Sequence, residues 1–174
     1  MVRAAVWLPV TGPALETLER ARRRAQRRGG GPIFPLHLTL LSGIETTPEG
    51  GAEKLRSLAA RLSPFAVKLG RIDWREERYR CLFVSAEPST ALTAAQRLAC
   101  EIFAAHPSGP FEPHVSLLYG DIGDELKKQI AAELGGRLDL VLTADSVQLV
   151  EASAQRPVEE WRTLSERALG AAAP

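Results

Sequence analysis

The tetrapeptides His37-Leu38-Thr39-Leu40 and His114-Val115-Ser116-Leu117 share one pattern: a histidine, an apolar residue, a hydroxyl residue and a second apolar residue. The chain has 3 histidines, and two of them stand in this frame. Side chains on a β-strand alternate between its two faces, so each histidine shares a face with the hydroxyl residue two positions later. Two such strands facing each other would bring two imidazoles and two hydroxyls to one cleft, with the aliphatic residues buried behind them.

This set of groups suits phosphodiester hydrolysis. A neutral histidine can take a proton from water as general base, and a protonated one can give a proton to the leaving oxygen. The hydroxyls of Thr39 and Ser116 can donate hydrogen bonds to the non-bridging oxygens, where charge builds up in the transition state. We therefore predict that His37 and His114 are the catalytic pair and that the hydroxyls bind the phosphate. Because the motifs are nearly symmetric, they do not tell which histidine is the base.

Longer matches surround both motifs. They are Val6-Trp7-Leu8-Pro9, Pro35-Leu36 before the first motif, and Phe111-Glu112-Pro113 and Leu118-Tyr119-Gly120 on either side of the second. With these stretches the chain resembles the 2H phosphoesterase superfamily (2′-5′ RNA ligase-like proteins and cyclic phosphodiesterases), and most of all its cyclic phosphodiesterase branch. The resemblance covers nearly the whole chain.

The resemblance implies a reaction and a fold. The reaction is hydrolysis of ADP-ribose 1″,2″-cyclic phosphate or a nucleoside 2′,3′-cyclic phosphate to a monophosphate, with no metal and no cofactor. The resemblance also places Trp7 and Tyr119 in the substrate-binding site. The fold it implies is α+β, bilobal and pseudo-symmetric, with two mainly antiparallel sheets facing a central cleft and helices packed outside.

Several features also have a plain structural interpretation. Trp7 can be a core residue and Tyr119 a half-buried strand aromatic. His106 has no hydroxyl partner in the same frame and fits the end of a helix. The arginines between Arg20 and Arg28 fit the solvated face and C-terminal end of a helix, although they could instead form a patch for RNA.

Two other functions stay open. The first is an RNA-end 2′,3′-cyclic phosphodiesterase or 2′-5′ RNA ligase-like enzyme, which a basic surface beside the cleft would favour. The second is a non-catalytic nucleotide-binding module, which would have little need for two proton-transfer groups. Other chemistries lack their motifs: the sequence has no cysteine and histidine spacing typical of zinc, no G-x-S-x-G element and no phosphate-binding glycine loop before a lysine.

The composition indicates an ordinary globular protein. The chain has 174 residues, of which 45% are hydrophobic, a net charge of +1 and 2 cysteines. We expect a single domain over residues 1–174, made of two lobes with one motif each, and a disordered tail over 170–174. With no secretory signal and no membrane-length apolar run, we expect a cytoplasmic monomer that acts on a small cyclic phosphate nucleotide, with RNA ends as a further possible partner.

Apolar periodicity and turn residues predict the elements. Residues 75–78 would form the tip of a hairpin, and 158–169 is ambiguous, a helix by propensity and a strand by the resemblance. The remaining elements divide by type: strands are predicted over residues 2–8, 36–42, 65–74, 79–86, 114–119 and, as one or two strands, 138–151. Helices are predicted over residues 11–28 (with Thr11 as the cap), 48–62, 88–105 and 121–134.

Overall fold

The computed structural model describes residues 1–107 and 109–170, and strands and helices alternate along them. The strands are β1 (Val2–Pro9), β2 (His37–Thr46), β3 (Phe65–Trp74), β4 (Leu82–Ala86), β5 (His114–Leu118), β6 (Arg137–Ala144), β7 (Ser146–Glu151) and β8 (Arg162–Ala168). The helices are α1 (Pro13–Gly29), α2 (Pro48–Arg61), α3 (Thr90–Phe103) and α4 (Asp124–Glu133), with short 3-10 turns η1 (Arg78–Arg80) and η2 (Val158–Glu160).

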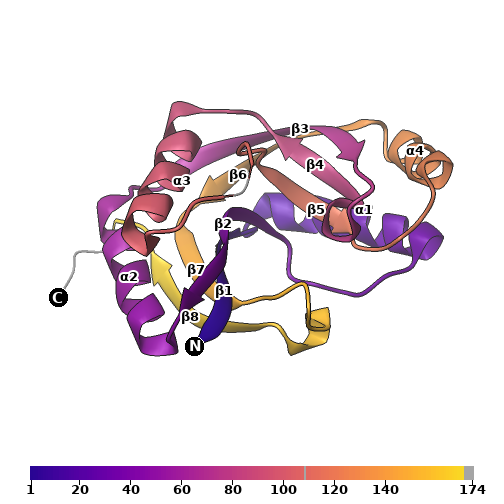
Figure 1. Cartoon of the computed structure of the whole chain (residues 1–174). Coiled ribbons are helices and arrows are strands. Elements are labelled where there is room, and N and C mark those ends of the chain that lie inside the picture. Colours follow the sequence, from indigo (N-terminus) through magenta and orange to yellow (C-terminus); the bar gives the residue numbers. More distant parts are fainter. Residues whose placement is uncertain (108, 171–174) are drawn as a thin grey trace.

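The eight strands form one curled antiparallel sheet in the order β6-β3-β4-β5-β2-β1-β7-β8 (Figure 1). The two strands that carry the motifs, β2 and β5, are neighbours at its centre and pair through a single position, Leu38 with Val115. We call β2-β1-β7-β8 the His37 half and β5-β4-β3-β6 the His114 half. The predicted α+β class with antiparallel strands is confirmed, and the two expected sheets are the two halves of this one sheet.

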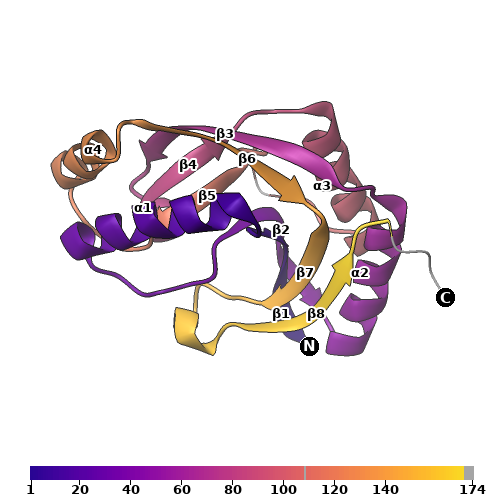
Figure 2. The same ribbon diagram turned by 180° about the vertical axis from the view of Figure 1, so that it is seen from behind.

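Two helices, α1 and α3, cross over between the halves (Figure 2). Helix α1 connects β1 to β2 in the His37 half but packs against β5 and α4. Helix α3 connects β4 to β5 in the His114 half but packs against β2 and α2. Fully buried leucines line these contacts, among them Leu18 of α1 and Leu92 of α3. The halves are therefore held together mainly by apolar packing, which offsets the short seam between β2 and β5.

The stretch predicted as one or two strands over 138–151 consists of two strands that belong to different halves. Strand β6 pairs with β3, whereas β7 pairs with β1 and β8. The chain passes from one half to the other at Asp145, whose carbonyl accepts a hydrogen bond from the Leu169 N–H at 2.8 Å. The His114 half is thus one continuous segment, and the His37 half combines both ends of the chain.

Three local predictions are corrected. Gly12, at φ 67°, precedes α1 as its cap residue in place of Thr11, and it makes no side-chain cap. The strand predicted from residue 79 begins at Leu82, because the Arg80 N–H bonds back to the Glu77 carbonyl and closes the turn η1. The helix that propensity favours after Trp161 is absent from the described residues, since β8 pairs along β7, as the resemblance implied.

The end of the chain was predicted to be disordered from residue 170. Gly170 lies in a turn, and its N–H donates to the Ala59 carbonyl at 3.0 Å, so the prediction is wrong for this residue. Residues 171–174 lie outside the described residues. Within the described ranges, no helix has both the length and the apolar composition needed to cross a membrane.

Candidate active site

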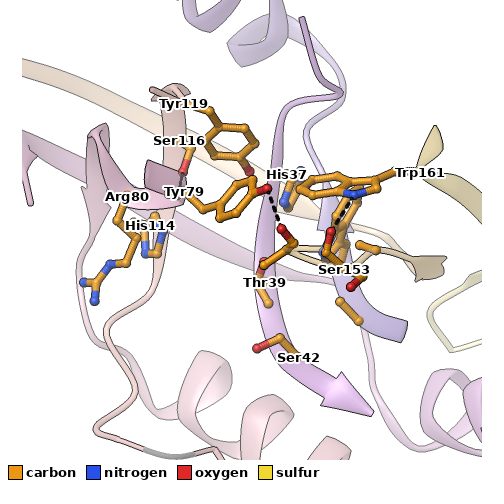
Figure 3. A pocket seen from close by; sticks show the side chains of 14 residues that line it. His37, Thr39, Ser42, Tyr79, Arg80, His114, Ser116, Tyr119, Ser153 and Trp161 are labelled. Atoms are coloured by element: carbon orange, nitrogen blue, oxygen red, sulfur yellow. Dashed lines mark hydrogen bonds between the residues drawn. The ribbon is translucent and has the colours of Figure 1, made fainter. Parts of the chain in front are cut away.

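A cavity of about 290 Å³ opens where β2 meets β5 (Figure 3). All six site residues predicted from the sequence line it: Trp7, His37, Thr39, His114, Ser116 and Tyr119. It also has lining residues that the sequence did not indicate, among them Ser42, Tyr79, Arg80, Ser153 and Trp161. The structure thus gathers residues from both halves of the sheet, and from the connection between β7 and β8, around one space.

The predicted alternation of side chains explains how the two strands build this site. Leu38 and Val115, the paired residues of the seam, are completely buried behind it, as is Leu117. The histidine and hydroxyl residues on either side of each of these positions point to the opposite face and reach the cavity. The two motifs therefore meet at one rung of the sheet, with their polar side chains on one face.

His37 lies in a buried aromatic environment. Its side chain is buried, and its ring stacks on the indole of Trp7 at 3.4 Å between centroids and 7° between planes. Its Nδ1 lies 2.7 Å from the Pro35 carbonyl oxygen. Burial lowers the pKa of His37 to about 4, against the raising effect of this hydrogen bond, because charging the ring would cost its hydration. His37 is therefore neutral at neutral pH.

His114 has charged neighbours. Its Nδ1 lies 2.8 Å from the Glu112 carbonyl oxygen, and its ring packs against Phe83 at 4.8 Å between centroids. Burial lowers the pKa of His114 below its ordinary value, and the nearby charge of Arg80 adds to this effect. The hydrogen bond to Glu112 and the carboxylates of Glu112 and Glu77 raise the pKa in opposition.

The two hydrogen bonds fix the same tautomer in both rings. A carbonyl oxygen can only accept, so Nδ1 of His37 and Nδ1 of His114 each carry a hydrogen and donate it to the carbonyl two residues earlier. In each ring Nε2 is then the nitrogen available for proton transfer. Both imidazoles are thus oriented in advance, which is the geometry that acid–base catalysis requires.

The hydroxyl groups differ in their surroundings. Thr39 lines the cavity on β2 in a half-buried position. Ser116 is buried, and its hydroxyl donates to the Tyr79 carbonyl at 3.2 Å. Burial raises the pKa of Tyr119 above its ordinary value, against a lowering effect of the Ser116 hydroxyl, so the Tyr119 hydroxyl keeps its proton. Tyr119 therefore lines the site as a neutral hydroxyl.

The segment before β2 holds His37 close to Tyr119. Gly31, at φ 90°, lies so close to the backbone of Tyr119 that an added Cβ would stand 2.2 Å from its carbonyl oxygen. Phe34 then stacks on the Tyr119 ring at 3.7 Å between centroids. These contacts need a residue without a side chain at position 31, and they connect the two halves beside the site.

The β7–β8 connection forms one wall of the cavity. The Trp161 indole N–H donates to the Ser153 carbonyl at 3.2 Å, and the Tyr79 hydroxyl donates to the Ala154 carbonyl at 3.3 Å (Figure 3). The second bond joins the His114 half to the His37 half. Trp161 also packs edge-on against Trp7, at 5.9 Å between centroids, so the aromatic wall continues around His37.

The other features singled out from the sequence lie away from the cavity lining. In α1, Arg20 pairs with Glu16, Arg23 pairs with Glu19, and Arg28 pairs with Glu133 of α4. His106 lies beyond the end of α3 at Phe103. Among the described residues, no cluster of three or more His, Cys, Asp or Glu side chains is arranged to hold a metal ion.

Comparison with known proteins identifies the family of the chain. The family model described as the 2′-5′ RNA ligase superfamily matches residues 9–164, so the chain belongs to this superfamily, the 2H phosphoesterases. A curated relative is a cyclic phosphodiesterase from Arabidopsis thaliana, 23% identical over 141 residues, which are 78% of this chain and 77% of the relative.

Solved structures share the fold. Apo LigT from E. coli superposes with a TM-score of 0.65 and 20% identity, covering 97% of both chains. TT0787 from Thermus thermophilus has a TM-score of 0.66 and 21% identity, covering 97% of this chain and 98% of its own. LigT complexed with 3′-AMP has a TM-score of 0.61 and 19% identity, over 97% of this chain and 98% of that one.

Proposed function

We propose that this protein is a cyclic phosphodiesterase that hydrolyses a ribose cyclic phosphate to a monophosphate without a metal ion. The substrate would be ADP-ribose 1″,2″-cyclic phosphate or a nucleoside 2′,3′-cyclic phosphate. The observation that carries the proposal is the matched anchoring of two imidazoles, each bound through Nδ1 to a carbonyl two residues earlier, around a cavity that also contains Thr39 and Ser116. The curated cyclic phosphodiesterase relative, and the LigT complexes with 3′-AMP and NADP⁺, support a nucleotide substrate.

The surroundings of the two rings favour one division of roles. His37 is neutral because of its burial against Trp7, so it suits the general base. Its Nε2 would take a proton from a water molecule while the water oxygen bonds to phosphorus. Burial also lowers the pKa of His114, but the carboxylates of Glu112 and Glu77 oppose this lowering, so of the two rings it is better suited to carry the proton of the general acid. Its Nε2–H would protonate the ribose oxygen as the bond from phosphorus to that oxygen breaks.

The hydroxyls would stabilise the charge on phosphorus. Thr39 and Ser116 stand on the same faces as the two histidines, one on each side of the seam, so they can donate to different non-bridging oxygens. Ser116 would turn its hydroxyl from the Tyr79 carbonyl to the phosphate when substrate binds. Both donors would then be in place before the bond to phosphorus forms, which lowers the barrier of the chemical step.

The RNA-end enzyme is the first alternative, and it depends on a basic surface beside the cavity. The arginine run of α1 does not support such a surface, since Arg20, Arg23 and Arg28 are engaged with acidic residues. The second alternative, a nucleotide-binding module, needs no oriented Nε2 atoms. Both remain outcomes of the experiment below.

The decisive experiment is hydrolysis, in EDTA, of ADP-ribose 1″,2″-cyclic phosphate, the four nucleoside 2′,3′-cyclic phosphates and a short RNA with a cyclic phosphate end. We expect turnover of the small compounds, and the product isomer identifies the oxygen that leaves. Turnover of the RNA alone would establish the RNA-end enzyme instead. Binding of the small compounds without turnover would establish the binding module.

A further inference from the structure

Arg80 is a cationic residue of the cavity wall that belongs to neither motif. It ends the turn η1 between β3 and β4, and most of its side chain is buried, with 23% exposed. Its Nη2 lies 2.6 Å from Oε2 of Glu112, and its Nη1 lies 3.9 Å from Oε1 of Glu77. Its Nε is buried and has no hydrogen-bond partner among the described residues. The two carboxylates therefore hold the guanidinium through Nη1 and Nη2, whereas Nε is held by none of the described residues.

Glu112 connects this arginine to His114. The side chain of Glu112 binds Arg80, and the backbone carbonyl of the same residue accepts the Nδ1–H of His114 at 2.8 Å. Phe83 completes the group: the Arg80 guanidinium lies 5.5 Å from the centroid of its ring, and the His114 ring packs against it. One glutamate thus contacts the arginine with its side chain and the histidine with its backbone.

We propose that Arg80 is a positioning residue that acts through Glu112 to hold the His114 ring and its proton in place. The ion pair with Arg80 fixes Glu112, and the carbonyl of Glu112 accepts the hydrogen bond from His114. Glu112 lies two residues before β5, at the end of the preceding loop. The proposal rests on the proposed function, in which His114 is the general acid. Because the Glu112 side chain of this pair is 48% exposed, water screens the pair and it contributes little to the stability of the fold, so its value lies in the geometry that it imposes.

The charges around His114 make the proposal testable by titration. Arg80 disfavours the imidazolium, whereas Glu112 and Glu77 favour it, and burial opposes it. His37, across the cavity, also interacts with His114 and is neutral at neutral pH. Removing the arginine leaves two carboxylates unopposed, so the pKa of His114 should rise. Removing the Glu112 carboxylate leaves the arginine opposed only by Glu77, so the pKa of His114 should fall.

The experiment compares Arg80→Gln, Arg80→Lys and Glu112→Gln, because Glu112→Gln keeps the backbone carbonyl that His114 uses. We follow the His114 ring by NMR across pH and measure kcat and KM on the nucleoside cyclic phosphate that the wild type turns over fastest. We expect the His114 pKa to rise in Arg80→Gln and to fall in Glu112→Gln. We expect kcat to fall about tenfold in both, with KM within about twofold of wild type, and Arg80→Lys to recover most of kcat.

Arg78→Gln is the matched control. It removes an arginine two positions away, whose partner is Asp121 at 2.8 Å, and it should leave both the titration and kcat unchanged. A rise in KM in Arg80→Gln with an unchanged His114 titration would overturn the proposal, because it would mean that Arg80 binds the phosphate directly. Unchanged titration in Glu112→Gln would overturn it too, and this variant tests the idea even if Arg80→Gln does not fold.

The titration separates this inference from the proposed function. If the wild type hydrolyses no cyclic phosphate, the proposed function fails. NMR still reports whether Arg80 and Glu112 change the pKa of His114. If the wild type is active but the two variants titrate like it, only the positioning role fails.

Discussion

His37 and His114 occupy equivalent positions on neighbouring strands, yet their rings are held by different forces. His37 stacks on Trp7 in a buried aromatic setting, whereas His114 lies beside the ion pair of Arg80 and Glu112. The anchoring bond from Nδ1 to a carbonyl is the same in both. The repeated sequence thus supplies a common orientation. The surroundings outside the motifs supply the difference, since burial lowers the pKa of both rings but the carboxylates of Glu112 and Glu77 oppose it only at His114. A pair that needs one base and one acid benefits from such a difference.

Replacing either histidine should have the largest effect. His37→Asn and His114→Asn keep a side-chain N–H near the position of Nδ1 but remove Nε2, so each should lower kcat by about 10²–10⁴-fold. Steady-state kinetics on a nucleoside 2′,3′-cyclic phosphate measures this, with circular dichroism as the check on folding. His106→Asn is the control and should retain wild-type activity.

An aryl phosphodiester substrate tests which of the two histidines is the general acid, with the same two variants. Its p-nitrophenolate leaves without needing a proton, so an enzyme that lacks its acid should recover much of its rate on this substrate. We expect recovery in His114→Asn and none in His37→Asn. The reverse pattern would exchange the two roles.

The burial of His37 should appear as a pH dependence of stability. Its pKa is about 4 in the folded chain and about 6.5 when unfolded, so protonation favours unfolding. The contribution of the neutral His37 ring to the free energy of unfolding is complete above pH 6.5. As the pH falls toward 4, the free energy of unfolding decreases by about 3 kcal/mol. Urea unfolding at several pH values should show this loss in the wild type, and a smaller slope in His37→Asn. Equal slopes in both proteins would mean that His37 is not the residue responsible.

The hydroxyl residues of the His37 half and the His114 half should have smaller effects on kcat than the histidines. Thr39→Val and Ser116→Ala each remove one donor to the phosphate and should lower kcat by about 10²-fold. Thr39→Val removes only that donor. Ser116→Ala also removes the hydrogen bond to the Tyr79 carbonyl, so we expect a lower unfolding midpoint in this variant alone. Equal midpoints would show that the bond between Ser116 and Tyr79 is not important for stability.

The smallest effect should come from Tyr119→Phe. The ring would keep its stacking on Phe34 and lose only its hydroxyl. We expect kcat to fall by less than about tenfold, since the proposed proton transfers use His37 and His114 and not this hydroxyl. A loss as large as that of a histidine variant would place the tyrosine hydroxyl on the reacting atoms.

The sequence predicted those site residues whose side-chain direction depends only on the alternation of faces along a strand. That principle placed His37, Thr39, His114 and Ser116 around one cavity. It failed for Ser42, because Leu40 and Leu41 are both buried and Gly43, at φ 74°, breaks the alternation. The Ser42-Gly43 dipeptide is typical of such a break and could have indicated it.

The remaining lining residues could not be placed from sequence because their positions depend on distant contacts. Tyr79 and Arg80 were assigned to a strand, but the turn η1 directs them into the cavity. Trp161 begins a segment with helix propensity that pairing with β7 makes into a strand. The crossing of α1 and α3 between the halves leaves no local pattern at all, since buried helix faces look alike whichever half they cover.

The route of the chain through the sheet also has a consequence for synthesis on the ribosome. The His114 half is encoded by one uninterrupted segment, whereas the His37 half needs strands from both ends of the chain. Until β7 and β8 have left the ribosome, β1 lacks its second neighbour and the Ala154 carbonyl that meets Tyr79 does not yet exist. Nascent chains that stop before β7 should therefore hold both motifs but lack the cavity wall that the β7–β8 connection forms, and the complete site should form only after β8 has been synthesised.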